Sequence, residues 1–149
     1  MNADKSLKIS IGSFVWNQHK DILSDVNSKD SDTQNLPVLI YNPNNIERRS
    51  YVKTDNENHI HHEKCIIINR GYSKNIYKFS VELIEPNDFP NGFICENHLL
   101  VITSDDENVI DRIYKSLNHK DTIEYINTYI TNGAMNTNDL QNNILLFED

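Results

Sequence analysis

The sequence contains few of the residues from which cofactor sites and disulfide frameworks are built. It has only four glycines, which lie far apart at Gly12, Gly71, Gly92 and Gly133. A glycine-rich turn that lets the backbone approach a cofactor closely is therefore absent. The two cysteines, Cys65 and Cys95, are too few for a disulfide framework and lie in apolar segments. We expect two reduced, partly buried thiols, no cofactor and no metal site.

Long apolar runs and recognisable catalytic patterns are missing as well. No run is long enough to span a bilayer, and residues 1–6 are polar and charged, unlike the start of a signal peptide. No nucleophile–histidine–acid arrangement stands out among the isolated carboxylates. We therefore expect a cytoplasmic protein that contacts no membrane and has no catalytic residues of its own.

Positive charge is scarce, and most of it lies early in the chain. The formal net charge is −8, which disfavours binding to a polyanion such as DNA. Residues 1–80 hold eleven Lys and Arg against nine Asp and Glu, whereas residues 81–149 hold three against thirteen. If the chain binds DNA, the first half should make most contacts, and the affinity should be weak without a basic partner.

The apolar pattern predicts a short mixed or antiparallel sheet in residues 7–103. Alternation of apolar and polar residues indicates half-buried strands, and compact apolar runs indicate buried ones. The predicted strands cover residues 7–11, 14–16, 36–41, 51–52, 65–69, 77–83 and 99–102. Asn17 is the predicted cap of a helical turn that reaches Leu23. Residues 24–35 and the rest of 42–62 are predicted loops.

Helices are predicted after the strands. Ser104 or Asp105 is the predicted N-cap of a first helix, whose apolar face consists of Val109, Ile110, Ile113, Tyr114 and Leu117. A second helix is predicted to begin at Asp121 or Thr122, with four residues facing inward, namely Ile123, Ile126, Tyr129 and Ile130. The sequence therefore predicts one α+β domain over residues 1–149, with a sheet in residues 7–103 followed by two or three C-terminal helices.

Two separated motifs resemble a known family. The first is Gly12 followed by Val15-Trp16-Asn17 and His19-Lys20, and the second is the apolar run Phe93-Ile94-Cys95 followed by Glu96-Asn97-His98. Their order and spacing resemble the target recognition domain of adenine-specific (N6) DNA methyltransferases of restriction–modification systems. The resemblance covers nearly the whole chain. It implies a domain that finds a DNA sequence while a separate catalytic domain performs the chemistry.

The catalytic half of such an enzyme is not present in this sequence. Methyl transfer to adenine needs a glycine-rich turn for the methyl donor and an Asn/Asp-Pro-Pro-aromatic motif for the flipped base. The nearest match to that motif, Asn42-Pro43-Asn44-Asn45, lacks the second proline and the aromatic and fits an ordinary turn. The resemblance thus implies a non-catalytic module, free-standing or part of a larger enzyme. Its implied partners are double-stranded DNA and a separate methyltransferase catalytic subunit.

The resemblance makes several polar and basic residues of the first half candidates for DNA contact. They are Asn17, His19, Lys20, Arg48, Arg49, Lys53, Arg70 and Lys74. Basic side chains reach phosphates, arginine reads guanine and asparagine reads adenine. Each candidate also has an ordinary interpretation as a turn residue or a solvated charge. Trp16 fits a core anchor better than a base-stacking platform.

Two further clusters have structural explanations that we favour. Glu96-Asn97-His98 is predicted to begin a strand, where Asn97 or His98 would satisfy buried backbone groups. The segment His59–Cys65, together with Cys95 and His98, contains the residue types that bind zinc. Its spacing matches no zinc module that we know, and histidines in a polar loop more often form an adventitious site, so no metal is predicted.

The function predicted from the sequence is DNA sequence recognition for an adenine-N6 methyltransferase or a restriction–modification enzyme. The alternative is an acidic protein-interaction module on the same scaffold, for example an inhibitor that mimics the charge of DNA. The excess of carboxylates in residues 81–149 favours this alternative. Duplex binding that weakens steeply with salt distinguishes the first function from the second.

Overall fold

Strands precede helices in the part of the chain that the structure describes. The computed structural model describes residues 7–13, 23–25, 36–40, 43, 50–52, 60–70 and 79–129. The strands are β1 (Lys8–Ile11), β2 (Leu23–Asp25), β3 (Val38–Ile40), β4 (Ser50–Val52), β5 (Cys65–Asn69), β6 (Val81–Ile84), β7 (Phe93–Cys95) and β8 (Leu99–Thr103). A short 3-10 helix, η6 (Pro86–Asp88), lies between β6 and β7, and the α-helices α1 (Glu107–Leu117) and α2 (Lys120–Tyr129) come last.

The strands form two four-stranded sheets. In the first sheet the order is β1-β8-β5-β6, and all neighbours are antiparallel. In the second sheet the order is β2-β4-β3-β7, and β3 and β7 are parallel. Parallel neighbours require a long connection. Here the connection between β3 and β7 includes β4 of the second sheet and β5 and β6 of the first, so the two sheets are interleaved along the chain.

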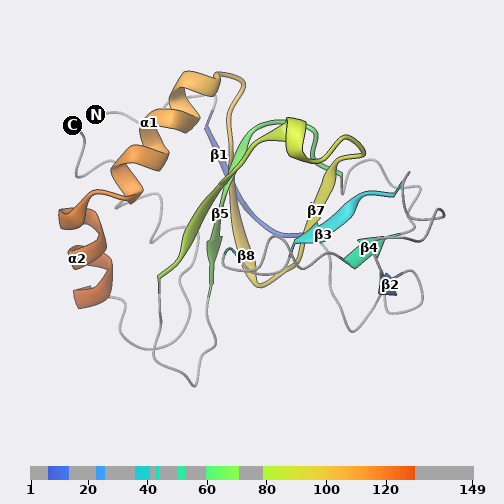
Figure 1. Cartoon of the computed structure of the whole chain (residues 1–149). Coiled ribbons are helices and arrows are strands. Elements are labelled where there is room, and N and C mark those ends of the chain that lie inside the picture. Colours follow the sequence, from blue (N-terminus) through green and yellow to red (C-terminus); the bar gives the residue numbers. More distant parts are fainter. Residues whose placement is uncertain are drawn as a thin grey trace.

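The two α-helices cover one face of the first sheet (Figure 1). Alternate residues of the two central strands point to this face, namely Ile66 and Ile68 of β5 and Leu100 and Ile102 of β8. The helices contribute Val109, Ile110, Ile113, Leu117 and Ile126. Partly buried residues of β6 and of the residues before it, Phe79, Val81 and Leu83, pack against the same cluster. The apolar stripe of α1 explains this packing, because its residues recur at the helical period.

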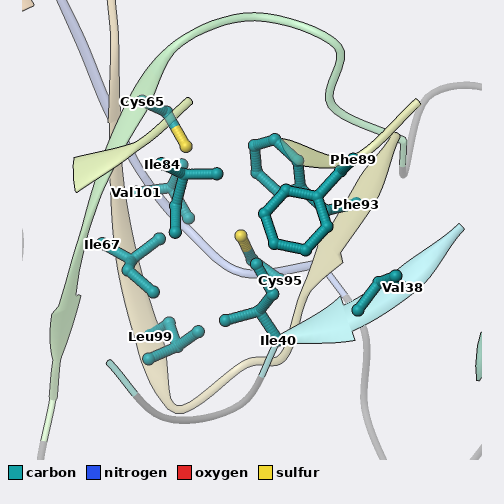
Figure 2. Close-up of a cluster of buried hydrophobic side chains, with 10 residues drawn as sticks. All are labelled: Val38, Ile40, Cys65, Ile67, Ile84, Phe89, Phe93, Cys95, Leu99 and Val101. Atoms are coloured by element: carbon teal, nitrogen blue, oxygen red, sulfur yellow. The ribbon is translucent and has the colours of Figure 1, made fainter. Parts of the chain in front are cut away.

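The other face of the first sheet packs against the second sheet. Figure 2 shows Cys65 and Ile67 of β5 on one side of this core and Ile40 of β3 and Phe93 of β7 on the other. The rings of Phe89 and Phe93 lie 5.6 Å apart between centroids and are tilted by 56°. Because β5 is covered on both faces, its run Cys65–Ile68 is apolar at every position, and each of these residues is 0% exposed.

The α+β class and the order of elements predicted from the sequence are confirmed. The predicted strands at 7–11, 36–41, 51–52, 65–69 and 99–102 coincide with β1, β3, β4, β5 and β8. The strand predicted at 77–83 corresponds to β6, which begins later, at Val81, and ends at Ile84. Residues 14–20, which include a predicted strand and the Asn17 cap, lie outside the described residues.

Other local predictions are wrong in detail. Leu23–Asp25 forms strand β2, whereas the sequence predicts a helical turn and a loop there. Its pairing with β4 provides backbone hydrogen bonds that the polar local sequence does not indicate. The N-cap of α1 is Asp106, whose carboxylate accepts a hydrogen bond of 2.9 Å from the amide of Asn108. Helix α2 begins at Lys120, slightly before the predicted start.

No helix among the described residues is long and apolar enough to cross a membrane.

The two cysteines lie in the core between the sheets. Cys65 and Cys95 are free thiols and are both 0% exposed, so they are more deeply buried than the sequence suggests. Burial raises the pKa of the Cys65 thiol well above its usual range, and the nearby Cys95 and Glu63 add to this shift. Burial likewise raises the pKa of the Cys95 thiol, with a further contribution from Glu63. Both thiols therefore stay protonated in the folded protein.

This burial predicts a loss of stability at alkaline pH. An unfolded thiol ionises above about pH 9, whereas the folded thiols cannot, so the unfolded state releases protons and is favoured. We expect the free energy of unfolding to fall with a slope approaching roughly 1 kcal/mol per pH unit for each thiol. Denaturant titrations at several pH values between about 8 and about 10 measure this slope.

Alanine substitutions provide the control for the alkaline slope. Cys65→Ala and Cys95→Ala should each lower the stability near neutral pH, because they leave a small cavity, but each should reduce the slope above about pH 9. An unchanged slope in both variants would show that the thiols are not its source.

Candidate functional site

A tight turn, Glu96–His98, carries the chain from β7 of the second sheet to β8 of the first. The amide of Leu99 donates to the Glu96 carbonyl at 3.0 Å, which closes the turn. One Glu96 carboxylate oxygen accepts the amide of His98 at 2.9 Å, and the other lies 2.6 Å from His98 Nδ1. The Glu96 side chain is 6% exposed, whereas that of His98 is 45% exposed. A buried carboxylate thus fixes a half-exposed histidine.

The sequence prediction for this tripeptide is wrong in one respect and incomplete in another. Glu96–His98 is the turn between two strands, not the beginning of a strand. The sequence predicts that the side chain of Asn97 or His98 satisfies buried backbone groups. In the structure the Glu96 carboxylate accepts the His98 amide, and Asn97 contributes its backbone carbonyl, which accepts from Arg70.

Three chain segments that are distant in sequence contact this turn. The carbonyl of Ile40, at the end of β3, accepts the Glu96 amide at 2.9 Å. The amide of Gly12, just after β1, donates to the carbonyl of Leu99 at 2.9 Å. The amide of Arg70, just after β5, donates to the His98 carbonyl at 2.9 Å, and Arg70 Nη1 donates to the Asn97 carbonyl at 2.8 Å. We call the end of the two sheets where these contacts occur the turn end.

Gly12 lies so close to the turn that no other residue fits. A Cβ atom at this position would overlap with the backbone carbonyl of Glu96 and approach that of Cys95 at 2.7 Å. The need for glycine is therefore one of space, because a Cβ atom could be admitted only by a shift of backbone atoms, which is more costly than the movement of a flexible side chain. Gly12 begins the first motif of the family resemblance and Glu96–His98 ends the second, and the structure places these two parts in direct contact. The rest of the first motif, residues 15–20, lies outside the described residues.

The segments that follow these contacts begin at the turn end. Residues 14–22 continue from Ser13, residues 41–49 from Ile40, and residues 71–78 from Arg70. The last two also return there, since Ser50 pairs with Leu39, and Ser80 accepts from and donates to Asn69. A fourth segment, 26–35, continues from Asp25, which pairs with Ser50 and therefore lies at the same end of the strands. It begins two strands away from β3, at the edge of the second sheet.

Most of the predicted DNA-contacting residues belong to these three segments. Asn17, His19 and Lys20 fall within 14–22, Arg48 and Arg49 within 41–49, and Lys74 within 71–78, and all of them lie outside the described residues. Arg70 is described and is partly buried at the turn end. Lys53 also lies outside the described residues; it follows Val52, which is at the end of β4 away from the turn end. Trp16 is also outside the described residues.

Positive charge is concentrated in the segments of the turn end. Residues 14–22, 41–49 and 70–78 contain six Lys and Arg and two acidic residues, Asp21 and Glu47, in a chain with a net charge of −8. The segment 26–35 has one Lys and two Asp. The sequence alone divides this charge only by halves of the chain, whereas the strand pairing shows that the residues from which these three segments continue lie close together.

The opposite end of the first sheet carries exposed carboxylates. Thr103 of β8 pairs there with Lys8 and Cys65, so the residues around these positions lie far from the turn along the strands. The exposed acidic residues that flank these strand ends are Glu63, Glu85, Asp105, Asp106 and Glu107. Lys64 lies among them and forms ion pairs of 3.4 Å with Glu85 and 2.6 Å with Asp111, which belongs to α1. These ion pairs, the one with Asp111 foremost, raise the pKa of Lys64.

The histidine-rich segment at this opposite end also has ordinary contacts. His61 pairs with Phe93 through its backbone and stacks on the Phe93 ring at 5.4 Å between centroids. Its Nδ1 lies 3.1 Å from Glu63. Burial would raise the pKa of Glu63, but hydrogen bonds from His61 and the His62 amide outweigh it and lower the pKa. No group of three or more potential metal ligands occurs among the described residues.

Comparisons of this chain with protein-family models, with curated proteins and with solved structures found no match.

The contact between Gly12 and the turn predicts that Gly12→Ala is destabilising. The added methyl group must displace backbone atoms of residues 95 and 96, and overpacking of this kind costs about 1–3 kcal/mol. Ser13→Ala, at the exposed neighbouring position, should change stability by less than about 0.5 kcal/mol. Chemical denaturation of the two variants and the parent protein tests this, and equal stabilities would contradict the observed contact.

The buried carboxylate predicts a second stability effect. Glu96→Gln keeps the shape of the side chain, and its amide group can still pair with the His98 amide and, in the other imidazole tautomer, with the His98 ring, but the hydrogen bonds to a charged group are lost, so we expect a loss of about 1 kcal/mol. Glu124→Gln, the same change on the solvent-facing side of α2, is the matched control and should have little effect. Thermal melting of both variants under identical conditions provides the comparison. A melting temperature of Glu96→Gln equal to that of the control would count against this role of Glu96.

Proposed function

We propose that this chain is a DNA sequence-recognition module of an adenine-N6 DNA methyltransferase or restriction–modification enzyme and is non-catalytic by itself. The turn end faces the duplex in this proposal. The observation that carries it is that Gly12, Ile40 and Arg70, after which the three basic segments follow in the sequence, contact the turn at residues 96–99, with exposed carboxylates at the opposite ends of the strands.

The charge distribution supports this orientation of the protein on DNA. Phosphates attract Lys and Arg and repel carboxylates, so the turn end is the end that duplex DNA approaches most favourably. The cations of the segments 14–22, 41–49 and 70–78 then contact the backbone, and their polar residues reach the edges of the bases. The net charge of −8 still opposes binding over a longer range, so affinity is low until a basic catalytic subunit is present.

The family resemblance supports the same function from another direction. Gly12, which begins the first motif, lies against Glu96–His98, which ends the second. These residues act as scaffold, and the segments that continue from them, which include residues 15–20 of the first motif, act as the recognition surface. This division of labour suits a domain whose scaffold is constant while the recognised DNA sequence varies.

The alternative function uses the opposite end of the fold. Exposed Asp105, Asp106 and Glu107 precede or begin α1, and Glu63 and Glu85 flank the neighbouring strands. A surface of this kind suits a basic protein partner, such as the DNA-binding cleft of another enzyme. In this case the chain binds that enzyme tightly and binds no duplex at any salt concentration.

Salt-dependent duplex binding is the test of the proposed function. Fluorescence anisotropy with a random-sequence duplex should show weak binding at about 50 mM salt that falls steeply by about 200 mM. The triple variant Arg48→Gln, Arg49→Gln, Lys74→Gln should bind more weakly than the parent protein. Its slope of log K against log salt should shrink by about 0.9 for each phosphate that it no longer neutralises.

A control with the same change in net charge separates local from overall electrostatics. The triple variant Lys8→Gln, Arg112→Gln, Lys115→Gln alters exposed residues of β1 and α1 that lie outside the turn end. It should keep most of the affinity and the salt slope. Equal losses in the two triple variants would place the DNA elsewhere, and absence of duplex binding by the parent protein at low salt would reject the function.

A further inference from the structure

Arg70 is the one Lys or Arg of the turn end that the structure describes, and its guanidinium group is held against the protein. Nη1 donates to the carbonyl of Asn97 at 2.8 Å, and the Arg70 amide donates to the carbonyl of His98 at 2.9 Å. Nε is buried and has no hydrogen-bond partner among the described residues. The residue as a whole is partly exposed. Nη1 and Nε therefore lie against the protein, while part of the residue remains exposed.

The positive charge of Arg70 is not paired with the carboxylate of the turn that it contacts. The two carboxylate oxygens of Glu96 are both engaged by His98, one by its amide and the other by its ring. The same Glu96–His98 contacts hold the turn whose Asn97 carbonyl binds Arg70, so the cation is positioned before any ligand arrives. Little side-chain entropy is then lost on binding.

This geometry suits a phosphate better than a base. An arginine that reads guanine extends into the major groove and directs two donors at O6 and N7. Arg70 cannot extend without breaking its bond to Asn97, and its buried Nε offers no donor outward. A phosphate lies on the outer surface of the duplex, so a side chain that stays at the protein surface can contact it without extending into a groove.

We propose that Arg70 binds a backbone phosphate of duplex DNA, fixes the register of the duplex on the turn end and reads no base. The inference rests on the proposed function and assigns the role of one residue within it. Base recognition then belongs to the segments 14–22, 41–49 and 71–78. This changes the expectation from the sequence, in which every arginine is an equal candidate for guanine recognition.

The experiment measures affinity and base preference separately. Arg70→Gln, Arg70→Lys and the matched surface control Arg112→Gln are compared with the parent protein on a randomised duplex library and on single duplexes at several salt concentrations. Arg70→Gln should lower the affinity for every duplex by a similar factor, about tenfold at low salt. Its salt slope should fall by about 0.9, and the preferred sequence should not change.

Thermal melting shows whether Arg70→Gln folds. If it does not, Arg70→Lys, which keeps the positive charge, takes its place in the experiment. It should show a smaller loss of affinity, again uniform across duplexes, and an unchanged salt slope. A changed base preference in either variant would show that Arg70 reads a base, and affinities equal to those of the parent and of Arg112→Gln would show that it makes no contact. Failure of the parent protein to bind any duplex would instead reject the proposed function, and this inference with it.

Discussion

The contacts of Glu96 hold the two sheets together at the turn end. Its backbone amide binds β3, its carbonyl closes the turn into β8 and lies against Gly12, and its carboxylate binds the amide and ring of His98. A buried carboxylate without such partners would be costly. Glu96 thereby joins the end of β3 to the first sheet, whereas β1 and β5 are held by their pairing with β8.

The parts of the fold that the sequence predicts are those in which side-chain pattern and burial agree. The run Cys65–Ile68 is apolar throughout because β5 is covered on both faces, and the stripe of α1 recurs at the helical period. β2 could not be predicted, because its residues Leu23–Asp25 carry no such pattern and form a strand only by pairing with β4. The parallel pairing of β3 with β7 is similarly non-local, and nothing in either segment specifies the other.

The candidate site shows the same limit. The sequence provides its residue types and, through the family resemblance, its two motifs. It does not show that Ile40 and Arg70 lie beside Glu96, since those contacts depend on strand pairing across both sheets. The inward orientation of the Arg70 guanidinium is also invisible in the sequence, because it depends on a backbone carbonyl at Asn97. One feature of the sequence could have identified Glu96 as a residue of the site: it is an acidic residue directly after the apolar run Phe93–Cys95.

Two of the basic segments leave and re-enter the sheets at almost the same place. Ile40 and Ser50 flank residues 41–49 at neighbouring positions of β3 and β4, and Arg70 and Ser80 flank residues 71–78 in the same manner. A connection whose two ends are neighbours tolerates insertions and deletions, since doubling its length costs only about 0.6 kcal/mol of closure entropy. Residues 71–78 can therefore be exchanged for a segment of different length at little cost, whereas the segment 41–49 contains Pro43, which is buried and would have to be kept.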